Sequence, residues 1–531
     1  MSNQPIRFYH RGEVITIDAA SPTRTVLDWL REDARCTGTK EGCNEGDCGA
    51  CTVLIGTLPE AGAVSAQAIR GLQLQSVNAC IQFLPTLHGK ALFTVEDLQR
   101  ITAPDPTVTP SGREAIALHP VQQAMVECHG SQCGFCTPGF VMSLFATYES
   151  HRASGSRPSR QQLADDLSGN LCRCTGYRSI LDAGQRMFDL PAIQLETAPV
   201  ITALRSIAGD TGLRYQARST AAADGATFHA PRTLDELAAL REAHPKATLL
   251  AGSTDVGLWV NKLFRPLGDI IFVGDVTELK TIAIHDGALR IGAGASLEAA
   301  WQALAGRFPS LTDVWLRFAS PPIRHAGTMG GNVANGSPIG DSAPVLMALG
   351  ASLLLRRGPA RRTVALDDFY LDYMKNALQP GEFVEAIDVP AAILSAADAR
   401  LRAYKISKRF DCDISAVCGA FWLRLDGDQV AEVRLVFGGM AATVKRAARA
   451  EAALLGKPWS QASVDVAKTA LAEDFKPLTD MRASADYRKR VVQNLLQRFW
   501  LETRRDAPLN ESQTSVWSVM PHQLLGQGEP V

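Results

Sequence analysis

The twelve cysteines of this 531-residue chain are unevenly placed, and eight of them fall in two groups within the first 174 residues. In the first group, Cys43, Cys48 and Cys51 are separated by four and then by two residues. Three thiolates at this spacing hold a [2Fe–2S] cluster when a fourth follows further along the chain. Cys80 is the natural fourth ligand, although Cys36 could compete for that place. A structural zinc site usually pairs its ligands as C-x2-C and fits the four-residue gap poorly, so this group predicts an iron–sulfur cluster.

The second group consists of two pairs, Cys133 with Cys136 and Cys172 with Cys174. A single C-x2-C pair could be a redox dithiol, and a single C-x-C pair carries little information. Together, within one predicted helical segment, the four thiolates indicate a second four-thiolate site. Three further cysteines are assigned to core packing, where a thiol behaves as a small hydrophobe: Cys128, Cys412 and Cys418.

Two glycine-rich segments could hold phosphate groups. Residues 249–257 (LLAGSTDVG) follow an apolar run, and residues 327–332 (GTMGGN) have the same character. Small residues let backbone N–H groups approach phosphate oxygens, and serine and threonine hydroxyls add donors. Taken alone, each segment is better explained as a plain turn. Residues 292–297 begin like a dinucleotide fingerprint but lack its third glycine, and the sequence contains no P-loop motif.

The composition limits the classes of protein to be considered. Lysine and arginine number 54 and aspartate and glutamate 55, a formal net charge of −1 that argues against a nucleic-acid-binding surface. With 46% hydrophobic and 21% charged residues the chain is typical of globular proteins, and its length predicts three or four domains. The sequence has no apolar run long enough for a membrane span and no secretory signal at its start. We therefore expect a soluble, cytoplasmic protein with reduced thiols and with neither nucleic-acid nor membrane partners.

The hydrophobic pattern indicates the elements that must position these groups. Apolar alternation at 6–8 and 14–17 predicts a β-hairpin, and 52–55 and 92–95 predict further strands. Thr137 followed by proline predicts a helix N-cap with proline at the first helical position. Further along, the pattern predicts a surface loop, a helix, a linker and two strands, in this order: 151–158, 159–167, 191–223, 421–425 and 431–436.

Three cysteine-containing motifs, CNEGDCGAC, SQCGFCTPG and NLCRCTGYR, occur in this order. They closely resemble the iron–sulfur part of the molybdenum hydroxylases, a family that includes xanthine dehydrogenases, aldehyde oxidoreductases and carbon monoxide dehydrogenases. The resemblance implies a ferredoxin-like domain followed by a four-helix domain, each holding one [2Fe–2S] cluster. The implied ligands are Cys43, Cys48, Cys51 and Cys80 in the first domain and Cys133, Cys136, Cys172 and Cys174 in the second.

The motifs LLAGSTDVG, RHAGTMGGNVANGSPIGD and YKISKRFDCDIS resemble the flavin domain of the same family, over residues 224–505. The resemblance implies that two segments surround the FAD diphosphate: Leu249, Leu250, Ala251, Gly252, Ser253, Thr254, Asp255 and Val256, with Thr328, Met329, Gly330, Gly331 and Asn332. Phe318 matches the aromatic residue that flanks the isoalloxazine ring. Asp341, Val384 and Lys405 match further FAD contacts.

The expected fold is a multidomain α+β protein. Its parts are a ferredoxin-like β-grasp domain (1–95), a four-helix [2Fe–2S] domain (96–190), a linker (191–223), an α+β FAD-binding domain of the molybdenum hydroxylase type (224–405), a C-terminal α+β flavoprotein subdomain (406–505) and a tail (506–531).

Two one-electron clusters and FAD on one chain imply an electron carrier rather than a complete hydroxylase. Because we expect no molybdopterin region after the flavin region, the fusion of iron–sulfur and flavin parts resembles the small subunit of bacterial xanthine dehydrogenases. That resemblance implies a separate subunit with the molybdopterin cofactor, two copies of each chain, and electron flow from hypoxanthine or xanthine through the second cluster, the first cluster and FAD to NAD⁺. Three alternatives stay open: a subunit of an aldehyde- or heteroaromatic-oxidising hydroxylase, a stand-alone NADH-dependent reductase, and a zinc-stabilised interaction module.

Overall fold

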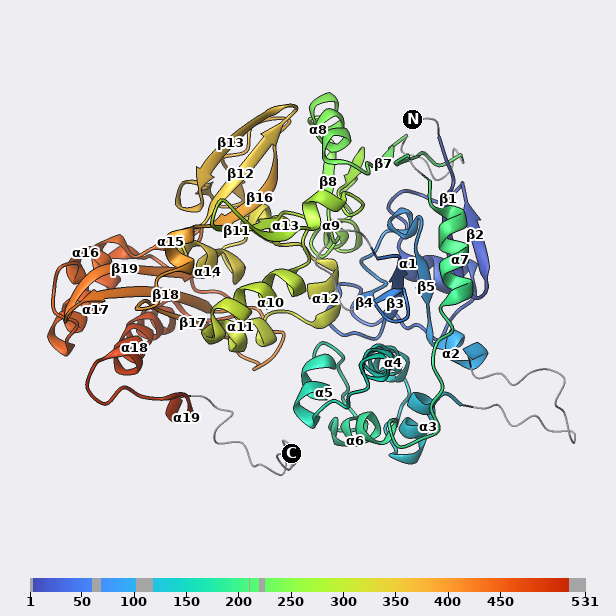
Figure 1. The fold of residues 1–531 in the computed structure, drawn as a ribbon, viewed down its shortest axis with the longest axis horizontal. Coiled ribbons are helices and arrows are strands. Elements are labelled where there is room, and N and C mark those ends of the chain that lie inside the picture. The colour runs from blue at the N-terminus through green and yellow to red at the C-terminus, as the bar shows by residue number, and fades with distance from the viewer. Residues whose placement is uncertain (1–2, 60–67, 102–117, 210, 219–224, 515–531) are drawn as a thin grey trace, which may run out of the picture.

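The computed structural model describes residues 3–59, 68–101, 118–209, 211–218 and 225–514, and contains both helices and sheets (Figure 1). Within this part of the chain, no helix is long and apolar enough to cross a bilayer. The predicted tail lies outside the described residues beyond position 514, as do short parts of the predicted linker and of the predicted helical domain.

The N-terminal block is a five-stranded sheet with strand order β2-β1-β5-β3-β4. Its strands are β1 (Ile6–His10), β2 (Glu13–Ile17), β3 (Thr52–Thr57), β4 (Gln73–Asn78) and β5 (Ala91–Phe93). The predicted hairpin is confirmed: β1 pairs antiparallel with β2, through left-handed backbone at Arg11 and Gly12. The strand predicted at 92–95 ends at Phe93, because Val95 already begins helix α2 (Val95–Ile101). The short helix α1 (Val26–Asp28) packs its apolar residues into the core beneath this sheet.

The second block is helical and contains α3 (Pro120–Glu127), α4 (Thr137–Ser154), α5 (Arg160–Asp166) and α6 (Arg178–Arg186). The predicted start of α4 was wrong by one residue, since Cys136 is the N-cap and Thr137 the first helical residue. The loop predicted at 151–158 was wrong in its first half, because α4 continues to Ser154. Gly155, with φ of 69°, ends the helix in the left-handed conformation that glycine favours.

The segment predicted as a linker contains regular structure. Helix α7 (Ala198–Ile207) packs against β1, and strand β6 (Leu213–Tyr215) joins the next sheet. Buried Val200, Leu204 and Ile207 recur at helical spacing, so this helix had a signal in the sequence.

The flavin-type block contains two larger sheets, with strand orders β6-β7-β9-β8 and β10-β11-β16-β12-β13, and a two-stranded sheet of β14 (Tyr370–Asp372) and β15 (Lys375–Asn376). The first sheet adds β7 (Phe228–Ala230), β8 (Thr248–Leu250) and β9 (Ile270–Phe272) to β6. The second consists of β10 (Ile282–His285), β11 (Ala288–Gly292), β12 (Ser352–Arg357), β13 (Ala360–Ala365) and β16 (Phe383–Val389). The helices are α8 (Leu234–Ala243), α9 (Val256–Asn261), α10 (Leu297–Arg307), α11 (Thr312–Arg317), α12 (Pro321–Ala326), α13 (Met329–Asn335), α14 (Ser342–Ala348) and α15 (Ala391–Leu394).

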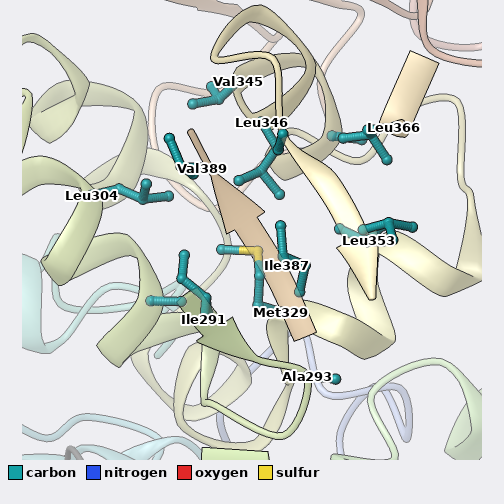
Figure 2. Packing of buried hydrophobic residues seen from close by; sticks show 14 of the residues in the cluster. Ile291, Ala293, Leu304, Met329, Val345, Leu346, Leu353, Leu366, Ile387 and Val389 are labelled. Carbon is teal, nitrogen blue, oxygen red and sulfur yellow. The ribbon is translucent and has the colours of Figure 1, made fainter. Parts of the chain in front are cut away.

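The core of this block lies between its second sheet and its helices. Figure 2 shows Met329 of α13 between Ile291 of β11 and Ile387 of β16, with Leu346 of α14 above them. All four side chains are fully buried. The segment predicted as a second glycine-rich turn is in fact the first turn of α13, because the hydroxyl of Thr328 accepts the Gly331 N–H and caps the helix.

The C-terminal block has a four-stranded antiparallel sheet, β17 (Arg400–Ile406), β18 (Val417–Asp426), β19 (Gln429–Gly438) and β20 (Lys445–Arg446). Helices α16 (Ala448–Leu454), α17 (Gln461–Asp474) and α18 (Ala485–Thr503) cover it (Figure 1). The two strands predicted in this region are confirmed, each longer at both ends than expected.

Candidate cofactor sites

The sulfur atoms of the first cysteine group lie together in two pairs. The Cys43 N–H points at Cys48 Sγ at 3.4 Å and the Cys48 N–H at Cys43 Sγ at 3.3 Å. Cys51 Sγ lies 3.3 Å from Cys80 Sγ. Cys36, which competed with Cys80 in the sequence, instead contacts the side chains of Arg11 and His10. The structure therefore brings Cys80, rather than Cys36, to the other three thiols.

The backbone of the loop that carries this group fits closely around its sulfur atoms. A Cβ on Gly42 would lie 2.7 Å from Cys48 Sγ, which leaves no room for a side chain there. Gly46 and Gly49 have φ of 80° and 69°, so the backbone can wrap tightly with its N–H groups turned inward. The hydrogen bond from Cys48 lowers the pKa of the Cys43 thiol to about 5, and backbone N–H groups of the loop act in the same direction. The same hydrogen bond raises the pKa of the Cys48 thiol, so within this pair Cys43 is the one favoured as a thiolate, the form that binds metal.

The second cysteine group is also arranged in pairs. The side chain of Cys136 lies close enough to that of Cys172 to perturb its pKa, and Cys133 lies equally close to Cys174. Thr175 donates its N–H and its hydroxyl to Cys172 Sγ at 3.4 and 3.3 Å, and burial together with Cys172 raises the pKa of Cys136 to about 12. Cys133 and Cys174 are exposed at the surface of the helical block.

The pairing of the sulfur atoms distinguishes a structural zinc site from a [2Fe–2S] cluster, the two kinds of metal site that the cysteine spacing raised. A structural zinc ion needs its four ligands to converge on one point. Among the described residues, no group of three or more histidine, cysteine or acidic side chains is arranged to hold a single ion. Two thiolates for each of two irons is the arrangement of a [2Fe–2S] cluster, so the thiol pairs fit that group better than zinc.

The two cysteine groups are joined by hydrogen bonds, one of which is buried. The Leu171 N–H, directly before Cys172, donates to the Cys48 carbonyl at 3.0 Å. The buried Asn170 side chain donates to the Gly49 carbonyl at 3.1 Å and accepts from Ser143 Oγ at 2.7 Å. Sequence reasoning missed Asn170, because its partners lie far from it along the chain.

A cavity of about 380 Å³ lies beside the first glycine-rich segment. Its lining includes most of the residues expected to contact FAD: Leu249, Ala251, Gly252, Ser253, Thr254, Asp255, Val256, Thr328, Gly330, Gly331, Asn332 and Val384. The lining also includes apolar side chains that the sequence analysis did not single out, among them Trp259 and Phe383. Nothing in the sequence separates such residues from ordinary core residues.

The cavity wall offers polar groups that have no partner in the protein. Ser253 Oγ and Asn332 Oδ1 are buried without a hydrogen bond. In the described chain the backbone N–H groups of Gly252, Ser253 and Thr254 also donate none. Buried polar groups are normally paired, so unpaired donors around a cavity fit a phosphate-containing ligand such as the diphosphate of FAD.

Glycine is required at two places in this wall. A Cβ on Gly252 would lie 1.8 Å from the Ala326 carbonyl oxygen, and one on Gly330 would lie 2.4 Å from Ala293 Cβ. Both contacts are with parts of the chain that cannot swing away. The glycines therefore allow the two segments to approach closely enough to share one cavity.

Five of the predicted FAD contacts do not line this cavity. Leu250 and Met329 are fully buried in the core. Phe318 packs on Trp301 with ring centroids 5.8 Å apart and is 9% exposed. Lys405 Nζ forms a buried ion pair with Asp341 Oδ2 at 2.6 Å. Ser415 contacts both charged groups.

Four family models match successive parts of the chain. They are "2Fe-2S iron-sulfur cluster binding domain" over residues 8–83, "[2Fe-2S] binding domain" over 107–185, "FAD binding domain in molybdopterin dehydrogenase" over 221–392 and "CO dehydrogenase flavoprotein C-terminal domain" over 402–503. The chain belongs to the molybdenum hydroxylase family. The predicted multidomain α+β class, with [2Fe–2S] and FAD-binding domains, is confirmed by these matches.

Individual relatives within the family differ in the activity that their names describe. A xanthine dehydrogenase of Emericella nidulans is 31% identical over 93% of this chain and 38% of its own length. An aldehyde oxidase 2 of Cavia porcellus is 29% identical over 99% of this chain and 42% of its own length. A structure of the carbon monoxide dehydrogenase of Hydrogenophaga pseudoflava is 29% identical over 51% of this chain and 94% of its own, with a TM-score of 0.48. The chain spans about two fifths of the length of the curated relatives it matches.

Proposed function

We propose that this chain carries electrons between a molybdenum-cofactor subunit and NAD⁺, as the iron–sulfur and FAD subunit of a xanthine dehydrogenase. The observation that carries the proposal is the presence on one chain of two thiol groups and of one cavity lined by unpaired polar groups. The first thiol group lies between the second thiol group and the cavity, joined to the one by Asn170 and Leu171 and to the other through helix α9.

The residues of this chain would hold and orient three cofactors. Cys133, Cys136, Cys172 and Cys174 would bind the cluster nearer the partner, and Cys43, Cys48, Cys51 and Cys80 the inner cluster. The unpaired N–H groups of residues 252–254 would hold the FAD diphosphate. When bound, the clusters exchange single electrons, and FAD exchanges electron pairs with a nicotinamide. The exposure of Cys133 and Cys174 supports an outer cluster at the surface, where a partner subunit could approach it.

The substrate proposal rests on the relatives. A xanthine dehydrogenase matches this chain at 31% identity, a nicotinate hydroxylase at 30% and an aldehyde oxidase at 29%. We therefore propose hypoxanthine and xanthine as the substrates of the assembled enzyme, with an aldehyde or a heteroaromatic compound as the second candidate. A closed assembly with two copies of each chain is the expected form, since most oligomers close by two-fold symmetry.

Expression with and without the molybdenum subunit tests the proposal. The chain purified alone should reduce artificial dyes with NADH, because that reaction needs only flavin and clusters. It should not hydroxylate a purine, an aldehyde or nicotinate. The assembled enzyme should oxidise xanthine with NAD⁺ as acceptor, and a preference for an aldehyde would replace the substrate proposal. Purine turnover by the isolated chain, with molybdenum shown to be absent, would contradict the whole assignment.

A further inference from the structure

Helix α9 connects the FAD cavity directly to the first cysteine group. It begins at Val256, where the glycine-rich loop ends, and the side chains at its other end reach the cysteine loop. Asn261 Nδ2 donates to the Cys80 carbonyl at 2.7 Å and to Asn44 Oδ1 at 3.2 Å. Lys262 Nζ donates to the Cys43 carbonyl at 2.5 Å. Two consecutive residues of the flavin-type block thus bind the backbone of two predicted cluster ligands.

The contact also includes the start of the helix. A Cβ on Gly257 would lie 2.9 Å from the carbonyl oxygen of Ile81, the residue after Cys80. Glycine at this position therefore lets α9 lie directly on the segment that carries the fourth thiol. A shift of the helix would move both the cavity wall and the cysteine loop.

The charges around this contact have opposite signs. Lys262 Nζ lies 3.7 Å from Glu45 Oε2, inside the same loop, and both side chains are about two fifths exposed. A four-thiolate [2Fe–2S] cluster is anionic and gains one more negative charge when it accepts an electron. A nearby ammonium stabilises the reduced form, whereas a carboxylate destabilises it. Hydrogen bonds, net charge and solvent exposure are the factors that set the potentials of such clusters.

We propose that Lys262 and Asn261 are positioning residues that set the reduction potential of the first cluster from the flavin side. This inference rests on the proposed function, because it requires that Cys43, Cys48, Cys51 and Cys80 bind the cluster. Lys262 raises the potential through its charge, and Asn261 fixes the Cys80 backbone through its amide. Glu45 lowers the reduction potential of the first cluster through its negative charge, so its effect is opposite to that of Lys262.

An EPR-monitored redox titration of the purified holoprotein with dithionite tests the proposal. In Lys262→Gln, the ratio of reduced to oxidised first cluster at a fixed potential should fall about threefold or more, where each tenfold change corresponds to 59 mV at a one-electron centre. Glu45→Gln should change the ratio in the opposite direction, and Lys262→Arg should behave like the wild type. The Lys262→Gln shift should shrink at high ionic strength, because the pair is partly exposed.

Controls separate an electrostatic effect from a general disturbance. The second cluster in the same molecules should keep its potential, with its signal assigned in a Cys133→Ser variant. Lys457→Gln, an exposed lysine in the C-terminal block, should leave both clusters unchanged. An unchanged first-cluster potential in both Lys262→Gln and Glu45→Gln, or equal shifts in both clusters, would overturn the inference. A wild-type holoprotein without a first-cluster signal would overturn the proposed function as well.

Discussion

At the scale of single residues, the eight cysteines of the two groups carry the redox assignment, and their positions predict an order of transfer. Cys133 and Cys174 of the second group are exposed at the surface, whereas Cys51 and Cys80 of the first group are buried beside the flavin-type block. The account therefore predicts that the second group exchanges electrons with the partner subunit and the first group with the flavin.

Serine substitutions at Cys133 and at Cys43 should interrupt electron transfer at two different points in the assembled enzyme. Both variants should lose purine oxidation with NAD⁺. In Cys133→Ser, NADH should still reduce the flavin and the first cluster, whereas in Cys43→Ser the purine should still reduce the second cluster. Anaerobic EPR and absorption spectra measure both outcomes. Because metal binding and folding are linked, circular dichroism must first show that each variant is folded. Loss of NADH-to-flavin transfer in a well-folded Cys133→Ser would mean that the order is wrong.

The glycine-rich segment allows a sharper test of the FAD cavity. Gly252→Ala places a methyl group on top of the Ala326 carbonyl oxygen, so the loop must move and its N–H groups lose their positions. We expect most of the FAD to be lost while iron is retained, as measured by flavin and iron content per chain. The matched control is Gly306→Ala in α10, where an added Cβ meets no atom within 4 Å. Full FAD content in Gly252→Ala would contradict the placement of the diphosphate.

Asp166 predicts how stability depends on pH. Burial raises the pKa of this carboxyl to about 6, with Asp165 and Glu298 adding to the effect, and Thr147 donates to it at 2.9 Å. The folded protein therefore holds a proton that the unfolded chain releases, and the free energy of unfolding falls as the pH rises from about 4 to about 6. Above that pH range, the full free-energy cost of burying the ionised Asp166 carboxylate is present. Asp166→Asn should thus raise the thermal midpoint at pH 7.5 by about 2–4 °C, and should change it little near pH 4.

Asp189→Asn is the matched control for this prediction. Asp189 is exposed, and the hydrogen bond from Arg157 lowers its pKa, the opposite direction to Asp166. Its neutralisation should leave the thermal midpoint at pH 7.5 unchanged or slightly lower. Equal thermal midpoints for Asp166→Asn and the wild type at pH 7.5 would contradict the prediction that the ionised Asp166 side chain destabilises the folded protein.

At the scale of elements, features set by neighbouring residues could be predicted from the sequence. Features set by contacts between distant residues could not. The hairpin at β1 and β2 and the loop around Cys43 follow from local spacing, because turn residues and ligand spacing act over a few positions. The choice between Cys80 and Cys36 depended on which thiol the sheet brings to Cys51, so spacing alone left it open. Asn170 and Lys262 had no signal, because the carbonyls to which they donate, those of Gly49 and Cys43, lie more than 100 residues away.

Asn170 should hold the helical block against the N-terminal sheet. Asn170→Ala removes its hydrogen bonds with Gly49, Thr52 and Ser143. Each buried polar group left unpaired costs about 1–3 kcal/mol, so we expect a clearly lower thermal midpoint. Amide exchange should also become faster at Leu171, whose N–H donates to Cys48. Ser143→Ala, which removes one of these bonds, should show a smaller effect, and unchanged exchange at Leu171 in Asn170→Ala would contradict this role.

At the scale of the whole molecule, the blocks are arranged as the proposed electron path requires. The helices α3–α6 lie beside the N-terminal sheet, and that sheet contacts the flavin-type block through β4 and α12 (Figure 1). Ser76 of β4 and His325 of α12 share a hydrogen bond across this contact. The C-terminal sheet lies on the far side of the flavin-type block from the N-terminal sheet (Figure 1). The loop that joins β17 to β18 reaches the first cysteine group, where Arg409 Nη2 lies 3.9 Å from Asp47 Oδ1.

Counting electrons tests the central claim most directly. If one chain holds two one-electron clusters and one FAD, an anaerobic dithionite titration of the purified holoprotein should end after four electrons per chain. Two of these should reduce the flavin, and one should reduce each cluster, giving two distinct EPR signals. An end point at two electrons, with a flavin spectrum alone and zinc in the cysteine sites, would contradict the account.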